Sequence, residues 1–136
     1  MHYFLFFIYN LIAVPVLFAG AHIAAFFKPK IARGLRGRRH DLAGIRQGVS
    51  DWPAGAPRVW LHVASMGEFE QAKPVLRALK QNRPDCRILL TFFSPSGYDQ
   101  AHHFPSADLI SYLPFDSYRR SRRFLQLVQP DVFVVI

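Results

Sequence analysis

The 136-residue sequence lacks most of the features that mark a disulfide-rich, metal-binding or nucleotide-binding protein. It has one cysteine, Cys86, so no disulfide can form within the chain and no metal site is expected from a lone thiol. It has neither a G-x-G-x-x-G nor a Walker sequence, the common glycine-rich fingerprints for bound nucleotides. Acidic residues are scarce, with 9 Asp and Glu against 17 Lys and Arg and a formal net charge of +8. This excess favours partners with phosphate or anionic head groups, although nucleic acid fits the charge equally well.

Residues 1–27 are predicted to form a membrane-anchor helix, because residues 3–27 contain no Asp, Glu, Lys or Arg. At about 1.5 Å per residue this stretch would be about 37 Å long, enough to cross a hydrocarbon core of about 30 Å. A helix that lies in the membrane interface is the alternative, and the run is interrupted by Asn10, Pro15, Gly20 and His22. A cleaved signal peptide is disfavoured because no Lys or Arg precedes Lys28.

Residues 28–57 are predicted to form a basic neck that ends in a linker. Only Asp41 opposes the basic residues of the neck, which are Lys28, Lys30, Arg33, Arg36, Arg38, Arg39 and Arg46. Because positive flanks stay on the cytoplasmic side of a membrane, we expect everything after residue 28 to be cytoplasmic. The cluster is either a topology signal alone or a docking surface for a phosphorylated lipid. Glycine and proline are frequent in residues 47–57, which is typical of a linker.

Residues 58–136 are predicted to form an α/β domain. Apolar runs predict strands at residues 58–64, 87–93, 108–113 and 131–136, and helical patterns lie between them, the last at residues 116–129. This alternation, with short connections, predicts a Rossmann-like parallel sheet that is buried on both faces. The final strand also has a buried pattern with no polar residue after it. We therefore expect the chain to be the amino-terminal part of a longer protein.

Polar turns follow three consecutive strands, at residues 65–68, 94–97 and 114–116. The carboxyl ends of parallel strands share one edge of the sheet, and ligands bind at that edge. A carboxylate there, on a glycine turn, is placed to take a proton from a bound hydroxyl. The candidate catalytic residue is therefore Glu68, and the residues predicted to support the turns or bind an acceptor are Ser65, Gly67, Ser94, Ser96 and Gly97.

Other interpretations of these turns remain open. Glu68 would also suit the positive end of a helix dipole, or a solvated surface position with no role. As a general base it needs a pKa raised by burial, whereas a helix start lowers the pKa of a carboxylate. The turn at residues 94–97 presents backbone N–H groups to an anion, or is simply a capped helix with Ser94 as its N-cap.

The helix at residues 116–129 carries four arginines, at positions 119, 120, 122 and 123. We expect all four to lie on a solvated face opposite Phe124 and Val128. The residues expected on the inner face are Tyr118, Ser121, Phe124, Leu125 and Val128. Arg119 and Arg123, four residues apart, are spaced to hold a phosphate or a protein partner together. His62 lies within the first strand and is interpreted as a histidine of the core or one that supports the site.

The order and spacing of these motifs resemble the 3-deoxy-D-manno-octulosonic acid (Kdo) transferases of Gram-negative bacteria. The resemblance covers an apolar start, a basic stretch, and then W-L-H-V-A-S-M-G-E (60–68), S-P-S-G (94–97), L-P-F-D (113–116) and P-D-V-F-V-V-I (130–136). It implies the amino-terminal half of an inverting glycosyltransferase with the two-domain GT-B fold. Such an enzyme moves Kdo from CMP-Kdo to a lipid A precursor at the cytoplasmic face of the inner membrane. The resemblance implies that Glu68 is the general base and that no metal or other cofactor is needed.

The resemblance also implies parts that are absent from these 136 residues. A family member continues with an E-x-E-type acidic motif and a second domain that holds most CMP contacts, so we expect this chain to be inactive alone. Two alternatives remain. One is another membrane-associated GT-B enzyme, such as a lipid A disaccharide synthase or a peptidoglycan lipid glycosyltransferase. The other is a membrane-tethered module that binds protein or nucleic acid through its arginines; the family implies no nucleic acid partner.

Overall fold

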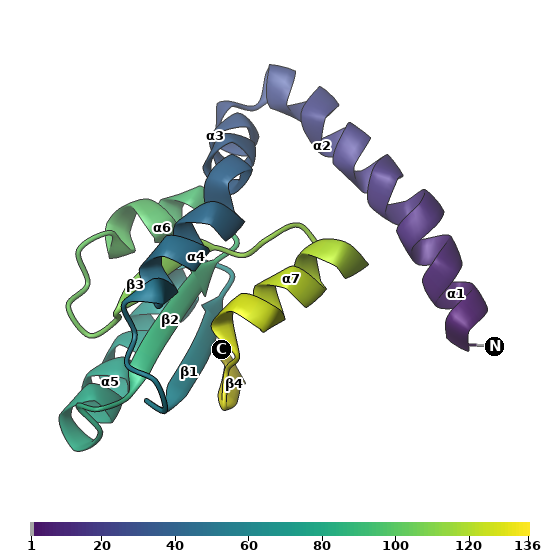
Figure 1. Ribbon diagram of the computed structural model, residues 1–136. Helices are drawn as coiled ribbons and strands as arrows, with labels where there is room; N and C mark the ends of the chain where they lie inside the picture. Colours follow the sequence, from purple (N-terminus) through teal and green to yellow (C-terminus); the bar gives the residue numbers. More distant parts are fainter. Residues whose placement is uncertain (1) are drawn as a thin grey trace.

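The computed structural model describes residues 2–136, apart from the side chains of residues 2, 3 and 40. An apolar arm, residues 2–27, consists of α1 (His2–Ile8), a π-helical segment η1 (Tyr9–Ala13) and α2 (Val14–Phe27). Next come α3 (Pro29–Gly37), a 3-10 turn η2 (Arg38–His40) and α4 (Asp41–Ser50). The remainder alternates as β1 (Arg58–Val63), α5 (Met66–Asn82), β2 (Arg87–Phe92), α6 (Pro95–Ala101), β3 (Leu109–Tyr112), α7 (Tyr118–Val128) and β4 (Val132–Val135). The predicted α/β fold, a parallel sheet preceded by an apolar helix, is confirmed (Figure 1).

The four strands are all parallel and lie in the order β3-β2-β1-β4. Trp60 on β1 lies between Leu89 on β2 and Phe133 on β4. The chain moves outward from β1 to β3 and then crosses back to place β4 on the other side of β1. The carboxyl end of β1 is therefore at the topological switch point, where open α/β sheets bind ligands.

Side chains that alternate along the strands fill two separate cores. On one face, Leu61 and Val63 pack with α5 and α6. Phe69 of α5 is 1% exposed there, with its ring 5.3 Å from that of Phe92 and 5.4 Å from that of Phe104. On the other face, Trp60 and Leu89 pack with α4 and α7. Burying a side chain of this size is worth about 1.5–3 kcal/mol, so both layers contribute to holding the sheet.

Helix α4 covers part of the second face, so the prediction of a linker from residue 47 is wrong as far as Ser50. Its residues Leu42, Ile45 and Val49 recur at helical spacing and pack on the sheet, with Ile45 fully buried. Gly48 allows the close approach, because a Cβ there would lie 2.6 Å from Leu109 Cδ1. Gly48, which suggested a linker, instead allows a helix to lie close to the sheet.

The apolar arm projects from the start of α3 and turns back past the beginning of α7 (Figure 1). Its segment Phe4–Phe27 is long and apolar enough to cross a membrane, with a window of mean hydropathy 2.1 that is not buried in the protein. Polar groups of the arm nevertheless meet the domain. The Tyr9 hydroxyl donates to Asp116 Oδ2 at 2.7 Å, and Asn10 Oδ1 accepts from the Tyr118 N–H at 2.9 Å.

Burial differs from the sequence pattern in two places among residues 2–136. Strand β4 pairs only with β1 among the described strands, and Val132, Phe133 and Val135 are each at least half exposed. On α7, Phe124 and Val128 are buried as expected, whereas Tyr118 and Leu125 are exposed. The apolar stripe of α7 is therefore narrower than the sequence pattern indicates.

Candidate active site

The turn between β1 and α5 is closed by two reciprocal hydrogen bonds. Ser65 is the N-cap of α5, and its Oγ accepts from the Glu68 backbone N–H at 3.3 Å. The Glu68 carboxylate reaches back, and its Oε2 accepts from the Ala64 backbone N–H. This arrangement is close to a capping box, in which a Ser N-cap and a Glu three residues later satisfy free N–H groups. The S-x-x-E spacing is visible in the sequence and indicates how the carboxylate is held.

Glu68 is ionised at neutral pH because the turn stabilises its charge. The bond from the Ala64 N–H lowers the pKa of Glu68 most, the contacts with Ser65 and the proximity of His62 lower it further, and partial burial opposes them. The pKa of Glu68 is therefore lowered at the helix start, as expected for a carboxylate in the first turn of a helix. The result is a carboxylate at the carboxyl edge of the sheet that is ready to accept a proton but is not an unusually strong base.

The turn at residues 94–97 touches the turn that carries Glu68. A Cβ on Gly97 would lie 2.6 Å from Phe92 Cδ1 and 3.6 Å from the Ser65 carbonyl carbon, so only glycine lets α6 start here. Gly67 differs, because a Cβ there would meet nothing closer than Ser65 Oγ at 3.9 Å. The structure thus brings Ser65 and Gly97 together and leaves the surface over Gly67 open.

The prediction that Ser94 is the N-cap of the helix after β2 is confirmed for its position but not for its side chain. Ser94 occupies the N-cap position of α6, but its side chain makes no capping hydrogen bond. Its hydroxyl lies 2.8 Å from the hydroxyl of Ser96 instead. The two serine hydroxyl groups are therefore hydrogen-bonded to each other at the start of α6.

His62 belongs to a small polar group on the α4–α7 face of the sheet. Its Nδ1 lies 3.0 Å from Thr91 Oγ1, which also accepts from Trp60 Nε1 at 2.8 Å. Burial lowers the pKa of His62, against the raising effects of Thr91 and the Glu68 carboxylate. The imidazole is therefore neutral at pH 7, and His62 supports the strand end near Glu68 as a half-buried residue.

Arg38 at this edge of the sheet does not belong to an exposed basic surface, although its sequence neighbours suggest that it does. It was grouped with the lipid-facing cluster, yet it is only 7% exposed. Its guanidinium donates to three carbonyl oxygens, those of Gly34 at 3.0 Å, Phe93 at 2.6 Å and Leu113 at 3.1 Å. The last two lie just beyond the ends of β2 and β3. Arg38 therefore ties the end of α3 to two loops at the carboxyl edge.

Aromatic rings surround the Arg38 guanidinium. Its Cζ lies 4.9 Å from the centroid of Phe93, 5.1 Å from that of Tyr112 and 5.6 Å from that of Phe115. Burial lowers the pKa of Arg38, but arginine remains charged. A Cβ on Gly37 would collide with the Tyr112 ring, so this glycine is also required by close packing.

Arg120 corrects the prediction of a fully solvated arginine face on α7. It donates to Asp41 Oδ1 at 2.6 Å, and the Asp41 side chain is 1% exposed. Arg120 precedes Phe124 by one helical turn, so it lies on the inward side, whereas Arg119, Arg122 and Arg123 are exposed. Arg120 thereby links α7 to α4 and is not available to a partner.

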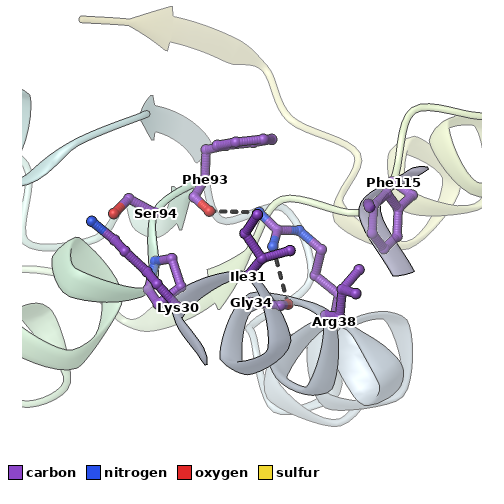
Figure 2. A pocket seen from close by; sticks show the side chains of 10 residues that line it. Lys30, Ile31, Gly34, Arg38, Phe93, Ser94 and Phe115 are labelled. Atoms are coloured by element: carbon purple, nitrogen blue, oxygen red, sulfur yellow. Dashed lines mark hydrogen bonds between the residues drawn. The ribbon is translucent and has the colours of Figure 1, made fainter. Parts of the chain in front are cut away.

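A cavity of about 430 Å³ opens between the arm, α3 and the loops at the carboxyl edge (Figure 2). Its walls come from Ala21 of α2, from one side of α3, and from the loops that begin at Phe93 and Leu113. Glu68 and the rest of the 65–68 turn are not among its lining residues. The ionised carboxylate is therefore separate from the largely apolar cavity. The turn at residues 94–97 lies between them, because Ser94 lines the cavity and Gly97 lies beside Ser65.

Comparison with known proteins identifies the relatives of this arrangement. Residues 36–136 match the family model described as 3-deoxy-D-manno-octulosonic-acid transferase (kdotransferase). A protein of that name from Haemophilus influenzae is 34% identical over 79 residues, covering 57% of this chain and 18% of the relative. The Aquifex aeolicus protein is 35% identical over 79 residues, covering 57% and 22%. The Chlamydophila psittaci protein is 27% identical over 106 residues, covering 75% and 24%.

The chain thus spans about a fifth of the length of these curated relatives, from 18% to 24%. No solved structure matches it significantly. The matched segment includes the sheet, the three turns and Arg38, whereas the arm lies before it.

Proposed function

Because the chain belongs to the 3-deoxy-D-manno-octulosonic-acid (Kdo) transferase family, we propose that it forms the acceptor side of a glycosyltransferase of lipopolysaccharide biosynthesis. In this proposal Kdo passes from CMP-Kdo to a lipid A precursor with inversion at the anomeric carbon. The CMP contacts come from a second domain outside residues 1–136, which completes a GT-B enzyme. The greater length of the relatives supports this division of roles.

We assign proton removal to Glu68. As the acceptor hydroxyl oxygen forms a bond to the anomeric carbon, Glu68 takes the hydroxyl proton. The bond from the anomeric carbon to the CMP phosphate breaks, and CMP leaves with the electron pair. Oε2 is held by the Ala64 N–H, so we expect Oε1 to receive the proton. The step uses a carboxylate alone and needs no metal. The observation that carries the proposal is an ionised carboxylate on a closed turn at the switch point of the sheet.

The test replaces the carboxylate and keeps its shape. Glu68→Gln should lower kcat by about 100-fold or more with KM for the acceptor little changed, since general base catalysis contributes about 10²–10⁴-fold. Glu70→Gln is the matched control, because Glu70 is exposed on the same helix and pairs with the neighbouring Lys73 at 2.6 Å. Both are assayed in the protein that joins these residues to its donor domain. Transfer by Glu68→Gln within threefold of the unchanged enzyme would remove the catalytic assignment.

We further propose that the arm does not span the bilayer. It lies in the interface on the cytoplasmic side of the inner membrane. The arm meets Asp116 and Tyr118 near its middle, through Tyr9 and Asn10, and α7 continues from there with exposed arginines. A spanning helix that kept these contacts would carry those arginines toward the hydrocarbon, where charge is costly. The aromatic contact of Phe6 with Tyr118, with ring centroids 5.4 Å apart, strengthens the same arrangement.

Labelling of cysteines introduced at the two ends of the arm distinguishes the orientations. Phe4→Cys and Phe27→Cys variants are bound to preformed vesicles, and a membrane-impermeant maleimide is added outside. Cys86 is buried and contributes little background. An arm along the surface leaves both positions reactive from outside. Protection of position 4 with reaction at position 27 would show that the arm spans the bilayer.

A further inference from the structure

We propose that the cavity between α2, α3 and the carboxyl edge of the sheet holds one acyl chain of a bilayer phospholipid, with the phosphate head group beside Lys30. This site is separate from the proposed acceptor site and does not depend on Kdo transfer. It would fix the angle at which the domain sits on the membrane.

The walls of the cavity suit a hydrocarbon chain. Apolar side chains come from the arm, from α3 and from the carboxyl-edge loops, and they are Ala21, Ile31, Leu35, Phe93, Pro95 and Phe115. The volume of about 430 Å³ lies within the range of about 300–1,000 Å³ that is usual for small-molecule sites. Gly34 lets α3 pack closely on the opposite wall of the cavity, because a Cβ there would lie 3.0 Å from Arg38 Nη1 and 3.3 Å from Pro95 Cγ.

Arg38 is not the group that would bind a phosphate. Each of its three nitrogens, Nε, Nη1 and Nη2, already donates to a backbone carbonyl. Two of those bonds, to Phe93 and Gly34, appear in Figure 2. Nη1 and Nη2 each carry a second N–H, but Arg38 is only 7% exposed and three aromatic rings surround its guanidinium, so an anion has little access to these groups. The Arg38 side of the cavity therefore behaves as a closed, aromatic-lined wall.

Lys30 provides the cation for a head group. It lines the cavity, is exposed, and has no ion pair among the described residues. Figure 2 shows its amine and the Ser94 hydroxyl directed to the same side of the cavity, away from Arg38. Arg36 and Arg39 are also exposed on this part of the neck, whereas Arg33 is paired with Asp99 at 3.3 Å. This positive surface is complementary to an anionic phosphate.

The position of the cavity favours a lipid from the bilayer over the sugar acceptor. Ala21 belongs to the apolar arm, so a chain can pass from the membrane into the cavity along a continuous apolar surface. The reacting hydroxyl of an acceptor must instead reach Glu68, and no residue of the 65–68 turn lines the cavity. A phospholipid needs only the apolar space and the neighbouring cation.

The test measures which lipids remain bound to the chain. The protein is reconstituted in phosphatidylcholine vesicles that contain a minority of phosphatidic acid, gently extracted, and examined by native mass spectrometry. The unchanged chain should retain one phosphatidic acid molecule in preference to phosphatidylcholine. Ala21→Leu, which fills the cavity, should reduce retention by about tenfold. Lys30→Met should reduce the preference for phosphatidic acid by about fivefold while some lipid is still retained.

Matched variants separate the site from general membrane affinity. Ala19→Leu adds the same group to α2 at an exposed position that does not line the cavity, and Lys28→Met removes a neighbouring charge that also lies outside it. Both should retain phosphatidic acid as the unchanged chain does, and thermal unfolding of the sheet should be equal in all variants. Equal losses in Ala19→Leu and Ala21→Leu would overturn the proposal, as would retention without head-group preference. Displacement of the lipid by an acylated glucosamine phosphate would reassign the cavity to the acceptor.

Discussion

The two edges of the sheet hold their carboxylates in different ways. At the amino edge, Asp108 accepts from Lys80 at 2.7 Å, from Arg87 at 3.0 Å and from the Ile88 N–H at 2.8 Å. At the carboxyl edge, Glu68 forms no ion pair with a Lys or Arg among the described residues and is held by the Ala64 N–H. Both pKa values are lowered, but Asp108 is enclosed by cations whereas Glu68 stays accessible. A lowered pKa alone therefore does not distinguish a structural carboxylate from a candidate base; the partners do.

Unlike the accessible Glu68, Arg38 is a buried charged residue of the carboxyl edge. Its removal should have the largest effect on stability. Arg38→Ala leaves the carbonyls of Gly34, Phe93 and Leu113 without their donor and opens a hole among three rings. We expect a loss of about 3–5 kcal/mol in the free energy of unfolding, measured by urea denaturation. Arg39→Ala, at an exposed neighbouring position, is the control and should change stability by less than about 0.5 kcal/mol. Similar values for both would mean that Arg38 does not join the loops.

Asp108→Asn should have the next largest effect and should depend on pH. Burial raises the pKa of Asp108, but the hydrogen bonds from Lys80, the Ile88 N–H and Arg87 outweigh it and leave the pKa lowered. A carboxylate with a lowered folded-state pKa stabilises the fold above its unfolded pKa, and this contribution disappears as the pH falls through the folded pKa. We expect a loss of about 2 kcal/mol at pH 7.

The pH dependence is the decisive part of that experiment. The difference in unfolding free energy between Asp108→Asn and the unchanged chain should shrink as the pH falls below the usual aspartate value of about 3.9. Asp85→Asn is the control, because Asp85 pairs with Arg83 at an exposed position. A difference that stayed constant with pH would show that the charge of Asp108 is not what stabilises the amino edge.

The two glycines of the carboxyl edge should respond in opposite directions. Gly97→Ala forces a Cβ against Phe92 and should cost about 1–3 kcal/mol. Gly67→Ala has space and lies within α5, so stability should stay the same or rise by up to about 1 kcal/mol. Thermal or urea unfolding measures both. A destabilising Gly67→Ala would show that the turn is more crowded than the structure indicates.

The smallest effect is expected from the exposed arginines of α7. Replacing Arg119 and Arg123 by Ala together should change the free energy of unfolding by no more than about 0.5 kcal/mol. Kdo transfer by the protein with its donor domain should also be unchanged. Arg120→Ala is the contrasting variant, because it leaves the buried Asp41 carboxylate without its cation. Loss of a protein or nucleic acid partner in the double variant would favour the alternative of a binding module.

Much of the fold follows from local pattern, since strand and helix positions need only the spacing of apolar residues. Helices α5, α6 and α7 lie between the parallel strands as predicted, and α7 (Tyr118–Val128) falls within the predicted residues 116–129. The edge that carries Ser65, Glu68 and Gly97 also follows, because parallel topology requires it. The errors concern which partner each residue finds. Arg38 and Arg120 look like surface charges in sequence, and Gly48 looks like part of a linker.

By itself, the sequence determined the alternation of strands and helices from residue 58 onward, the apolar character of the arm, the basic excess of the neck and the chemical identity of the candidate base. Those properties are local, because a side chain carries its charge and its hydropathy wherever it lies. Only the tertiary structure decided that Arg38 donates to three carbonyls, that α4 covers the sheet and that Arg120 pairs with the buried Asp41. Burial and hydrogen-bond partners depend on elements far apart in the chain, so no local pattern specifies them.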